Sequence, residues 1–165
     1  MMTCGVFVLQ PSADMWRRLQ MAKPPFFEHL AWMQGGEELW HAVKELEPCV
    51  LTGLPRGAWA EPQKRAWVSK HLGKNVKVHC CKSRDKKNYA ATCLRFQGRD
   101  AVLIDDRPSN CSDWRSVGGT AVEHKSPGET LQKLRDIGLL VQVSSDKGCS
   151  PALARAVLPN DLDCK

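Results

Sequence analysis

Long apolar stretches, an acidic charge balance and regularly spaced cysteines are all missing from this sequence. A transmembrane helix needs about 20 consecutive apolar residues, so we expect no membrane span. The first nine residues have neither a charged flank nor a long apolar core, so we expect no secretory signal and predict a cytoplasmic location, with an organelle left open. The net charge of +6 favours anionic partners, either phosphates or nucleic acid, without choosing between them.

The eight cysteines do not form a pattern that indicates a disulfide framework or a zinc site. Disulfide frameworks are typical of shorter secreted chains, so we expect reduced thiols here. Cys80 and Cys81, with His79 and Cys93, do not supply the two paired ligand sets of a structural zinc site. The cysteines therefore suggest no metal chemistry.

The length and the apolar content predict one globular domain over residues 1–165. Of the 165 residues, 42% are hydrophobic and 25% are charged, which is typical of a soluble protein with a core and excludes a disordered or fibrous class. Residues 10–35 are interpreted as the possible remnant of a small cap, and residues 139–165 as a C-terminal tail.

Predicted strands and helices alternate along the chain. This alternation predicts an α/β fold with an open, mostly parallel sheet covered by helices on both faces. The serine of Ser126-Pro127-Gly128-Glu129 has the spacing of a capping box. We expect strands over residues 5–9, 49–51, 76–80, 101–104, 118–124 and 139–143, and helices over 12–21, 26–33, 35–46, 61–72, 126–138 and 150–158.

One stretch carries the clearest chemical signal. In residues 101–108, the apolar run Ala-Val-Leu-Ile leads directly into Asp105, Asp106, Arg107 and Pro108. Apolar neighbours penalise two adjacent carboxylates unless a positive group faces them, and Mg²⁺ is a common partner of clustered carboxylate oxygens. The alternative is an acidic turn in which Arg107 pairs with one of the acids.

Three loops are expected at the carboxyl ends of the parallel strands, where ligands of such sheets bind. They contain Thr52-Gly53, Ser83 to Lys86, and Asp105-Asp106. A hydroxyl and an ammonium group can hold phosphate oxygens, and two carboxylates can hold a divalent cation. The sequence therefore predicts a phosphate and metal site at this edge of the sheet.

These motifs, in this order, resemble those of the haloacid dehalogenase-like phosphohydrolases, most closely the 5′(3′)-deoxyribonucleotidase branch. The resemblance covers residues 40–138 and implies a Rossmann-like, three-layer α/β/α fold. It implies that Thr52 and Lys86 act in catalysis by holding the transferring phosphoryl group of a small phosphorylated substrate or nucleotide. It also implies phosphate contacts from Gly53, and Mg²⁺ ligation by Asp105 with Asp106 as a further ligand. Arg56 either reaches the phosphate or is a solvated loop charge.

The chain departs from this family at the nucleophile. The family carries an Asp-x-Asp signature after its first strand, whereas Gln10, Pro11 and Ser12 follow the strand predicted here. Glutamine cannot form an aspartyl-phosphate, and serine cannot replace the second acid. Two hypotheses remain: an altered or truncated version of a Mg²⁺-dependent phosphatase, or an inactive phosphate- or nucleotide-binding regulatory module.

Nucleic-acid binding is a third hypothesis, based on the positive charge and on the dispersed tryptophans. No nucleic-acid module is recognisable, and dispersed tryptophans usually lie in a core, so nucleic acid is not the expected partner. The oligomeric state has no signal in the sequence.

Overall fold

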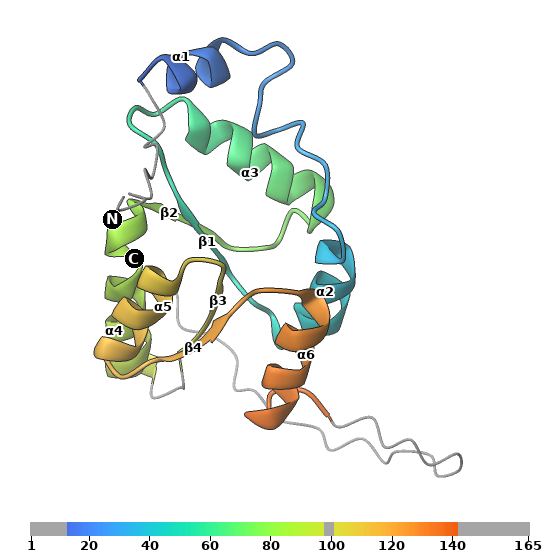
Figure 1. Cartoon of the computed structure of the whole chain (residues 1–165), viewed down its shortest axis with the longest axis vertical. Helices are drawn as coiled ribbons and strands as arrows, with labels where there is room; N and C mark the ends of the chain where they lie inside the picture. The colour runs from blue at the N-terminus through green and yellow to red at the C-terminus, as the bar shows by residue number, and fades with distance from the viewer. Residues whose placement is uncertain (1–12, 98–100, 142–165) are drawn as a thin grey trace, which may run out of the picture.

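The computed structural model describes residues 13–97 and 101–141 and confirms a mixed α/β chain (Figure 1). The strand predicted over 5–9 and the helix predicted over 150–158 lie outside these residues. None of the helices in the described ranges combines the length and the apolar character that crossing a membrane requires. The elements are α1 (Ala13–Met21), α2 (Gly36–Val43), η1 (Lys44–Leu46), β1 (Val50–Gly53), α3 (Ala60–His71), β2 (Val78–Cys81), η2 (Ser83–Asp85), α4 (Lys87–Gln97), β3 (Val102–Asp105), α5 (Pro108–Ser116), β4 (Thr120–Glu123) and α6 (Pro127–Asp136).

The four strands of the described residues form two parallel pairs rather than one sheet. In the first pair, β1 and β2 run in register from Val50 opposite Val78. In the second pair, β3 and β4 run in register from Val102 opposite Thr120. The predicted parallel arrangement is confirmed within each pair, and helices form the crossovers, as parallel neighbours require.

The hydrophobic core is concentrated around β3 and β4. On one side, Leu103 packs with Trp114 of α5 and Ala90 of α4. On the other side, Val122 of β4 packs with Leu134 of α6 and Val43 of α2. The predicted capping box explains where α6 begins, because the Glu129 backbone N–H donates to the Ser126 side-chain oxygen over 3.3 Å.

Backbone hydrogen bonds show which edge of β1 and which edge of β3 has no strand partner. The N–H groups of Val50 and Leu54 donate to carbonyls on the β2 side, so Leu51 and Gly53 direct their backbone groups to the opposite edge of β1. The carbonyls of Ala101 and Asp105 accept from the β4 side, which turns the intervening backbone groups of β3 outward. No strand in residues 13–97 or 101–141 pairs with either edge.

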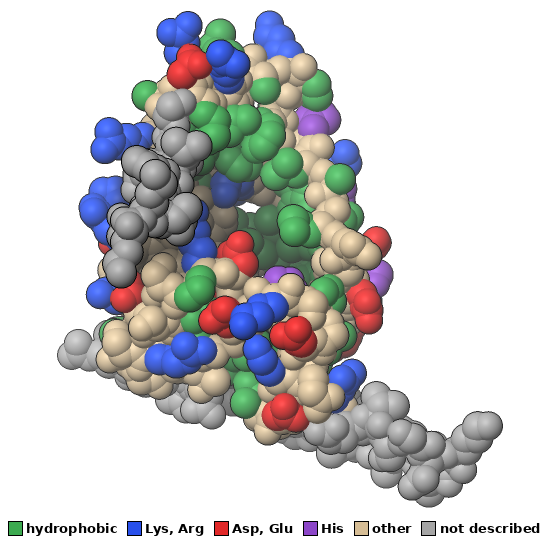
Figure 2. Space-filling model, viewed as in Figure 1, with side chains coloured by type: hydrophobic (Ala, Val, Ile, Leu, Met, Phe, Trp, Pro, Cys, Tyr) green, Lys and Arg blue, Asp and Glu red, His purple; other side chains and the backbone are tan. Residues whose placement is uncertain are grey.

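A central opening lies between the two strand pairs. Figure 1 shows β1 and β3 as the inner strands and β2 and β4 as the outer ones. Figure 2 shows a hollow between the part of the surface over α3 and the part over α5 and α6, with hydrophobic side chains along it. All four residues of β1 are half-exposed, although strands of parallel sheets are normally buried on both faces. The strand β1 is therefore incompletely covered.

Two predicted elements differ from the structure. Residues 26–29 form a turn and residues 30–33 are irregular, so no helix forms over 26–33. Their aromatic rings pack against the segment that contains α3: Phe27 stacks on Trp59, and Trp32 meets Trp67 edge-on. The spacing of these rings thus matches a tertiary contact and not a helix of their own. Leu139 and Leu140 do not begin a strand, because their N–H groups donate to the Leu134 carbonyl and end α6.

Candidate functional site

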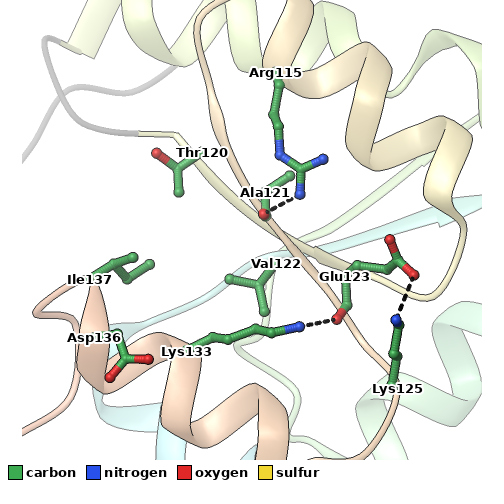
Figure 3. Close-up of a pocket in the computed structure, with 9 residues that line it drawn as sticks. All are labelled: Arg115, Thr120, Ala121, Val122, Glu123, Lys125, Lys133, Asp136 and Ile137. Carbon is green, nitrogen blue, oxygen red and sulfur yellow. Dashed lines mark hydrogen bonds and ion pairs between the residues drawn. The ribbon is translucent and has the colours of Figure 1, made fainter.

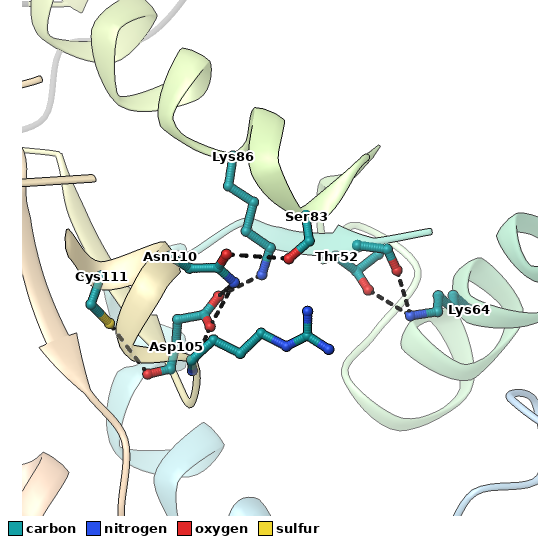
Figure 4. Close-up of polar contacts among 9 residues, drawn as sticks. Thr52, Lys64, Ser83, Lys86, Asp105, Asn110 and Cys111 are labelled. Carbon is teal, nitrogen blue, oxygen red and sulfur yellow. Dashed lines mark hydrogen bonds and ion pairs between the residues drawn. The ribbon is translucent and has the colours of Figure 1, made fainter. Parts of the chain in front are cut away.

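The buried carboxylate of Asp105 is held by three donors at the carboxyl end of β3 (Figure 4). The Lys86 ammonium donates to Oδ2 over 2.6 Å, and the Arg107 backbone N–H donates to Oδ1 over 2.9 Å. The Asn110 amide donates to both oxygens, over 2.9 and 3.1 Å. Arg107 immediately precedes α5 and Asn110 lies in its first turn, so the junction of β3 and α5 fixes the carboxylate.

The pKa of Asp105 reflects opposing influences. Burial raises it, because the carboxylate is taken out of water. The hydrogen bonds from Lys86, Arg107 and Asn110, together with the Lys86 charge, outweigh burial and lower the pKa below its ordinary value. The side chains of Lys86 and Asp105 are only 12% and 3% exposed, so this is a buried ion pair and Asp105 stays ionised at neutral pH.

A second ammonium group, from Lys64 of α3, reaches the end of β1 (Figure 4). Lys64 Nζ donates to Thr52 Oγ1 over 3.0 Å and to the Gly53 carbonyl over 2.9 Å. It also lies 4.5 Å from the centre of the Phe27 ring. Burial lowers the pKa of Lys64; the neighbouring Cys80 partly opposes this, and the positive charge of Lys86 lowers the pKa further. The two lysines are therefore close enough to repel each other.

The hydroxyl of Thr52 is oriented for a further contact. A threonine hydroxyl has one proton to donate and lone pairs that accept. Since Thr52 Oγ1 accepts from Lys64, its own proton can be donated to a third group. Thr52 is half-buried, so a ligand oxygen can reach it. The site thus combines a hydroxyl donor, the Lys64 ammonium bonded to it, and the Lys86 ammonium bonded to Asp105.

The predicted residues separate into two sets. Thr52, Gly53, Lys86 and Asp105 lie together at the carboxyl ends of β1, β2 and β3, as Figure 4 shows for the three labelled ones. Arg56 is exposed and lines a neighbouring cavity. Asp106 is exposed, and no described contact joins it to the Asp105 carboxylate.

The observed arrangement of Asp105 does not fit the predicted Mg²⁺. Hard cations need free carboxylate oxygens, and both oxygens of Asp105 accept hydrogen bonds, one of them from a cation. Mg²⁺ would have to displace Lys86. Within residues 13–97 and 101–141, no group of three or more histidine, cysteine, aspartate or glutamate side chains has metal-binding geometry. In the observed arrangement, the Asp105 carboxylate serves the ion pair with Lys86.

Three residues of this network were not predicted from the sequence: Lys64, Ser83 as an individual contact, and Asn110. A signal for Lys64 was present, because it falls at four-residue spacing between Ala60 and Val68, the two buried residues of α3. Lysine on the buried face of a helix requires a partner. Asn110 had no such signal, since its role depends on how α5 follows β3. Ser83 donates from its hydroxyl to Asn110 Oδ1 over 3.2 Å.

A second cavity, of about 310 Å³, lies between β4 and the end of α6 (Figure 3). Its cationic side chains already have partners. Arg115 donates to the Ala121 carbonyl, Lys133 donates to the Glu123 carbonyl, and Lys125 lies 3.9 Å from the Glu123 carboxylate. These contacts tie α5 and α6 to β4, and we assign this cavity a structural role.

No family model, no curated protein and no solved structure matches the chain.

Proposed function

We propose that the chain is a phosphate-binding module that holds a phosphorylated small molecule or nucleotide at the carboxyl ends of β1, β2 and β3. The observation that carries this proposal is that the carboxyl ends of these strands bring together the Thr52 hydroxyl, the Lys64 ammonium bonded to it, and the Lys86 ammonium bonded to Asp105 (Figure 4). Two like charges in a partly buried site disfavour each other. An anion placed between them removes that repulsion and accepts hydrogen bonds from all three groups.

The local charge favours an anion even after the ion pair is counted. Asp105 offsets one positive charge, and it lies on the β3 side of Lys86. Lys64 has no carboxylate among its hydrogen-bond partners, which are the Thr52 hydroxyl and the Gly53 carbonyl. The site is thus left with about one net positive charge at neutral pH, next to hydroxyl and ammonium donors.

Hydrolysis of a phosphomonoester is the second candidate function. The order of Thr52, Lys86 and Asp105 along the chain supports it, because this order resembles that of the haloacid dehalogenase-like phosphohydrolases. Against it stand Gln10, Pro11 and Ser12, which follow the predicted first strand and supply no carboxylate nucleophile. Binding requires only the groups that the structure brings together, so we place binding first.

We further propose that one more strand joins the two strand pairs into a single sheet, which would give the three-layer, Rossmann-like fold. The open edges of β1 and β3 are suited to one additional parallel strand between them. Residues 6–9, Val-Phe-Val-Leu, are continuously apolar, as a strand buried on both faces requires.

Calorimetric titration with inorganic phosphate at pH 7.5 tests the binding function. The wild-type chain is compared with Lys64→Met, and Lys70→Met is the matched control, because Lys70 is exposed on the same helix. Loss of a charged hydrogen bond should weaken binding by roughly tenfold or more in Lys64→Met, and the control should match wild type. Equal affinity in all three proteins, or no binding by wild type, would contradict the proposal.

The same titration with EDTA and with added Mg²⁺ separates the two candidate functions. For the binding module, phosphate binds equally under both conditions, and a generic phosphomonoester shows no Mg²⁺-dependent turnover above that of Asp105→Asn. Turnover that requires Mg²⁺ and is lost in Asp105→Asn would establish hydrolysis instead.

A further inference from the structure

A cavity of about 760 Å³ lies next to the end of β1 and has no part in the proposed phosphate contacts. We call it the loop cavity. Its walls are residues 54–57, which follow β1, and residues 81–84, which include the end of β2 and the loop after it. This volume is within the range of pockets that hold small organic ligands.

The charged side chains that line the loop cavity are all cationic. Arg56, Lys82 and Arg84 contribute three exposed cationic side chains. The Cys81 thiol adds no negative charge at neutral pH, because burial raises its pKa. The acid nearest to the lining is Asp85, whose carboxylate lies 3.8 Å from Arg84 in an exposed pair. Exposed pairs are weak, so Arg84 remains able to bind a ligand anion.

The loop cavity and the phosphate site share a wall. Ser83 lines the cavity, and its hydroxyl donates to Asn110, which in turn holds Asp105. Gly53 carries the carbonyl that Lys64 contacts, and a Cβ placed on Gly53 would lie 3.4 Å from the Ser83 Cβ. The end of β1, which carries Thr52, therefore adjoins the wall of the loop cavity.

We infer that the loop cavity binds a second phosphate group of the same ligand, so that the ligand class is a compound with two or more phosphates. This inference rests on the proposed function. One phosphate lies between Lys64, Lys86 and Thr52, and the second is bound by Lys82 and Arg84, with Arg56 facing it from the loop after β1. The half-buried Leu54 and Pro55 provide an apolar surface for the organic part of the ligand.

A length series of inorganic anions tests this inference on the full chain. Phosphate, pyrophosphate and tripolyphosphate are titrated at constant ionic strength into wild type and into the double variant Lys82→Ala with Arg84→Ala. The matched control is Lys74→Ala with Lys77→Ala, which removes the same charge from exposed positions before β2. Wild type and control should bind tripolyphosphate roughly tenfold tighter than phosphate, and the Lys82/Arg84 variant should lose this gain while its phosphate affinity is unchanged.

The outcomes separate the two proposals. A gain that persists in the Lys82/Arg84 variant, or that falls equally in the control, overturns the loop cavity as a binding site. Tripolyphosphate binding that depends on Lys82 and Arg84, without measurable phosphate binding, would show an anion site in the loop cavity but contradict the proposed phosphate site, and with it a single ligand that spans both. If none of the three anions binds to wild type, both proposals are wrong.

Discussion

The two strand pairs differ in how well they are buried. Around β3 and β4, Leu103, Trp114, Val122 and Leu134 are all at most 7% exposed. The β1–β2 pair has no buried strand residue, and no strand of the described residues pairs with the other edge of β1. The site draws its fixed carboxylate from the first region and its Thr52 hydroxyl from the second.

The two regions contribute differently to the site: one fixes the position of Asp105, and the other holds Thr52 and Lys64 on a half-exposed strand. Asp105 is held by the first turn of α5 against a packed core, so its position does not depend on a ligand. Thr52 and Lys64 hold each other at the end of a half-exposed strand. A ligand that binds only the folded chain stabilises it by mass action, and we expect that gain to appear mainly as greater protection of the β1–β2 pair.

The largest effect is expected where one residue joins the two regions. Lys86 follows β2 but pairs with Asp105 of β3. Replacing it in Lys86→Met leaves a buried carboxylate without its counter-ion, which should lower the free energy of unfolding by about 3–5 kcal/mol. Urea unfolding measures this loss, and adding Asp105→Asn to Lys86→Met should restore most of it. A loss below about 1 kcal/mol would show that the pair does not join the regions.

Truncating one leucine in each region compares their packing directly. Leu134 is 1% exposed and packs against Val122 and Val43, so Leu134→Ala should cost about 2–5 kcal/mol. Leu51 of β1 is half-exposed and packs against the core cluster of Leu103 and Trp114 from outside it, so Leu51→Ala should cost less, roughly 1 kcal/mol. Similar costs by urea unfolding would mean that β1 is covered as well as β3, and would favour a strand in the central opening.

A smaller effect is expected from acid. Because the folded pKa of Asp105 lies below its ordinary value of 3.8, the unfolded chain binds more protons between the two values. The contribution of this carboxylate to stability is therefore complete above pH 3.8 and is lost as the pH falls through the folded pKa. Urea midpoints over a pH series should show this loss in wild type, and Asp105→Asn should flatten that part of the curve. Parallel curves would contradict the buried pair.

The sequence was most informative where local chemistry decides the structure. The strand expected over 101–104 is observed as Val102–Asp105, and the helix expected over 61–72 as Ala60–His71. The predicted cap is also observed, because the Glu129 N–H donates to the Ser126 hydroxyl oxygen. These elements depend on β-branched runs, helix stop signals and a local hydrogen bond, all of which are encoded within a few residues.

Contacts between distant segments were harder to predict. The rings of Phe27 and Trp32 have helical spacing but meet Trp59 and Trp67 across the fold instead. The sequence predicted Lys86 as a phosphate contact but did not indicate that its ammonium is bonded to Asp105. Which cation pairs with which carboxylate depends on the distance between strand ends, and the order of motifs along the chain does not specify that distance.

The titration of Lys64 tests the central claim most directly. The ¹³Cε resonance of this lysine, assigned with Lys64→Arg, can be followed against pH with and without sulfate, a dianion whose charge is constant over the range. Burial and the charge of Lys86 place the midpoint below the ordinary 10.5, and saturating sulfate should raise it, because the bound anion favours the charged form. A midpoint that saturating sulfate leaves unchanged would contradict anion binding between Lys64 and Lys86.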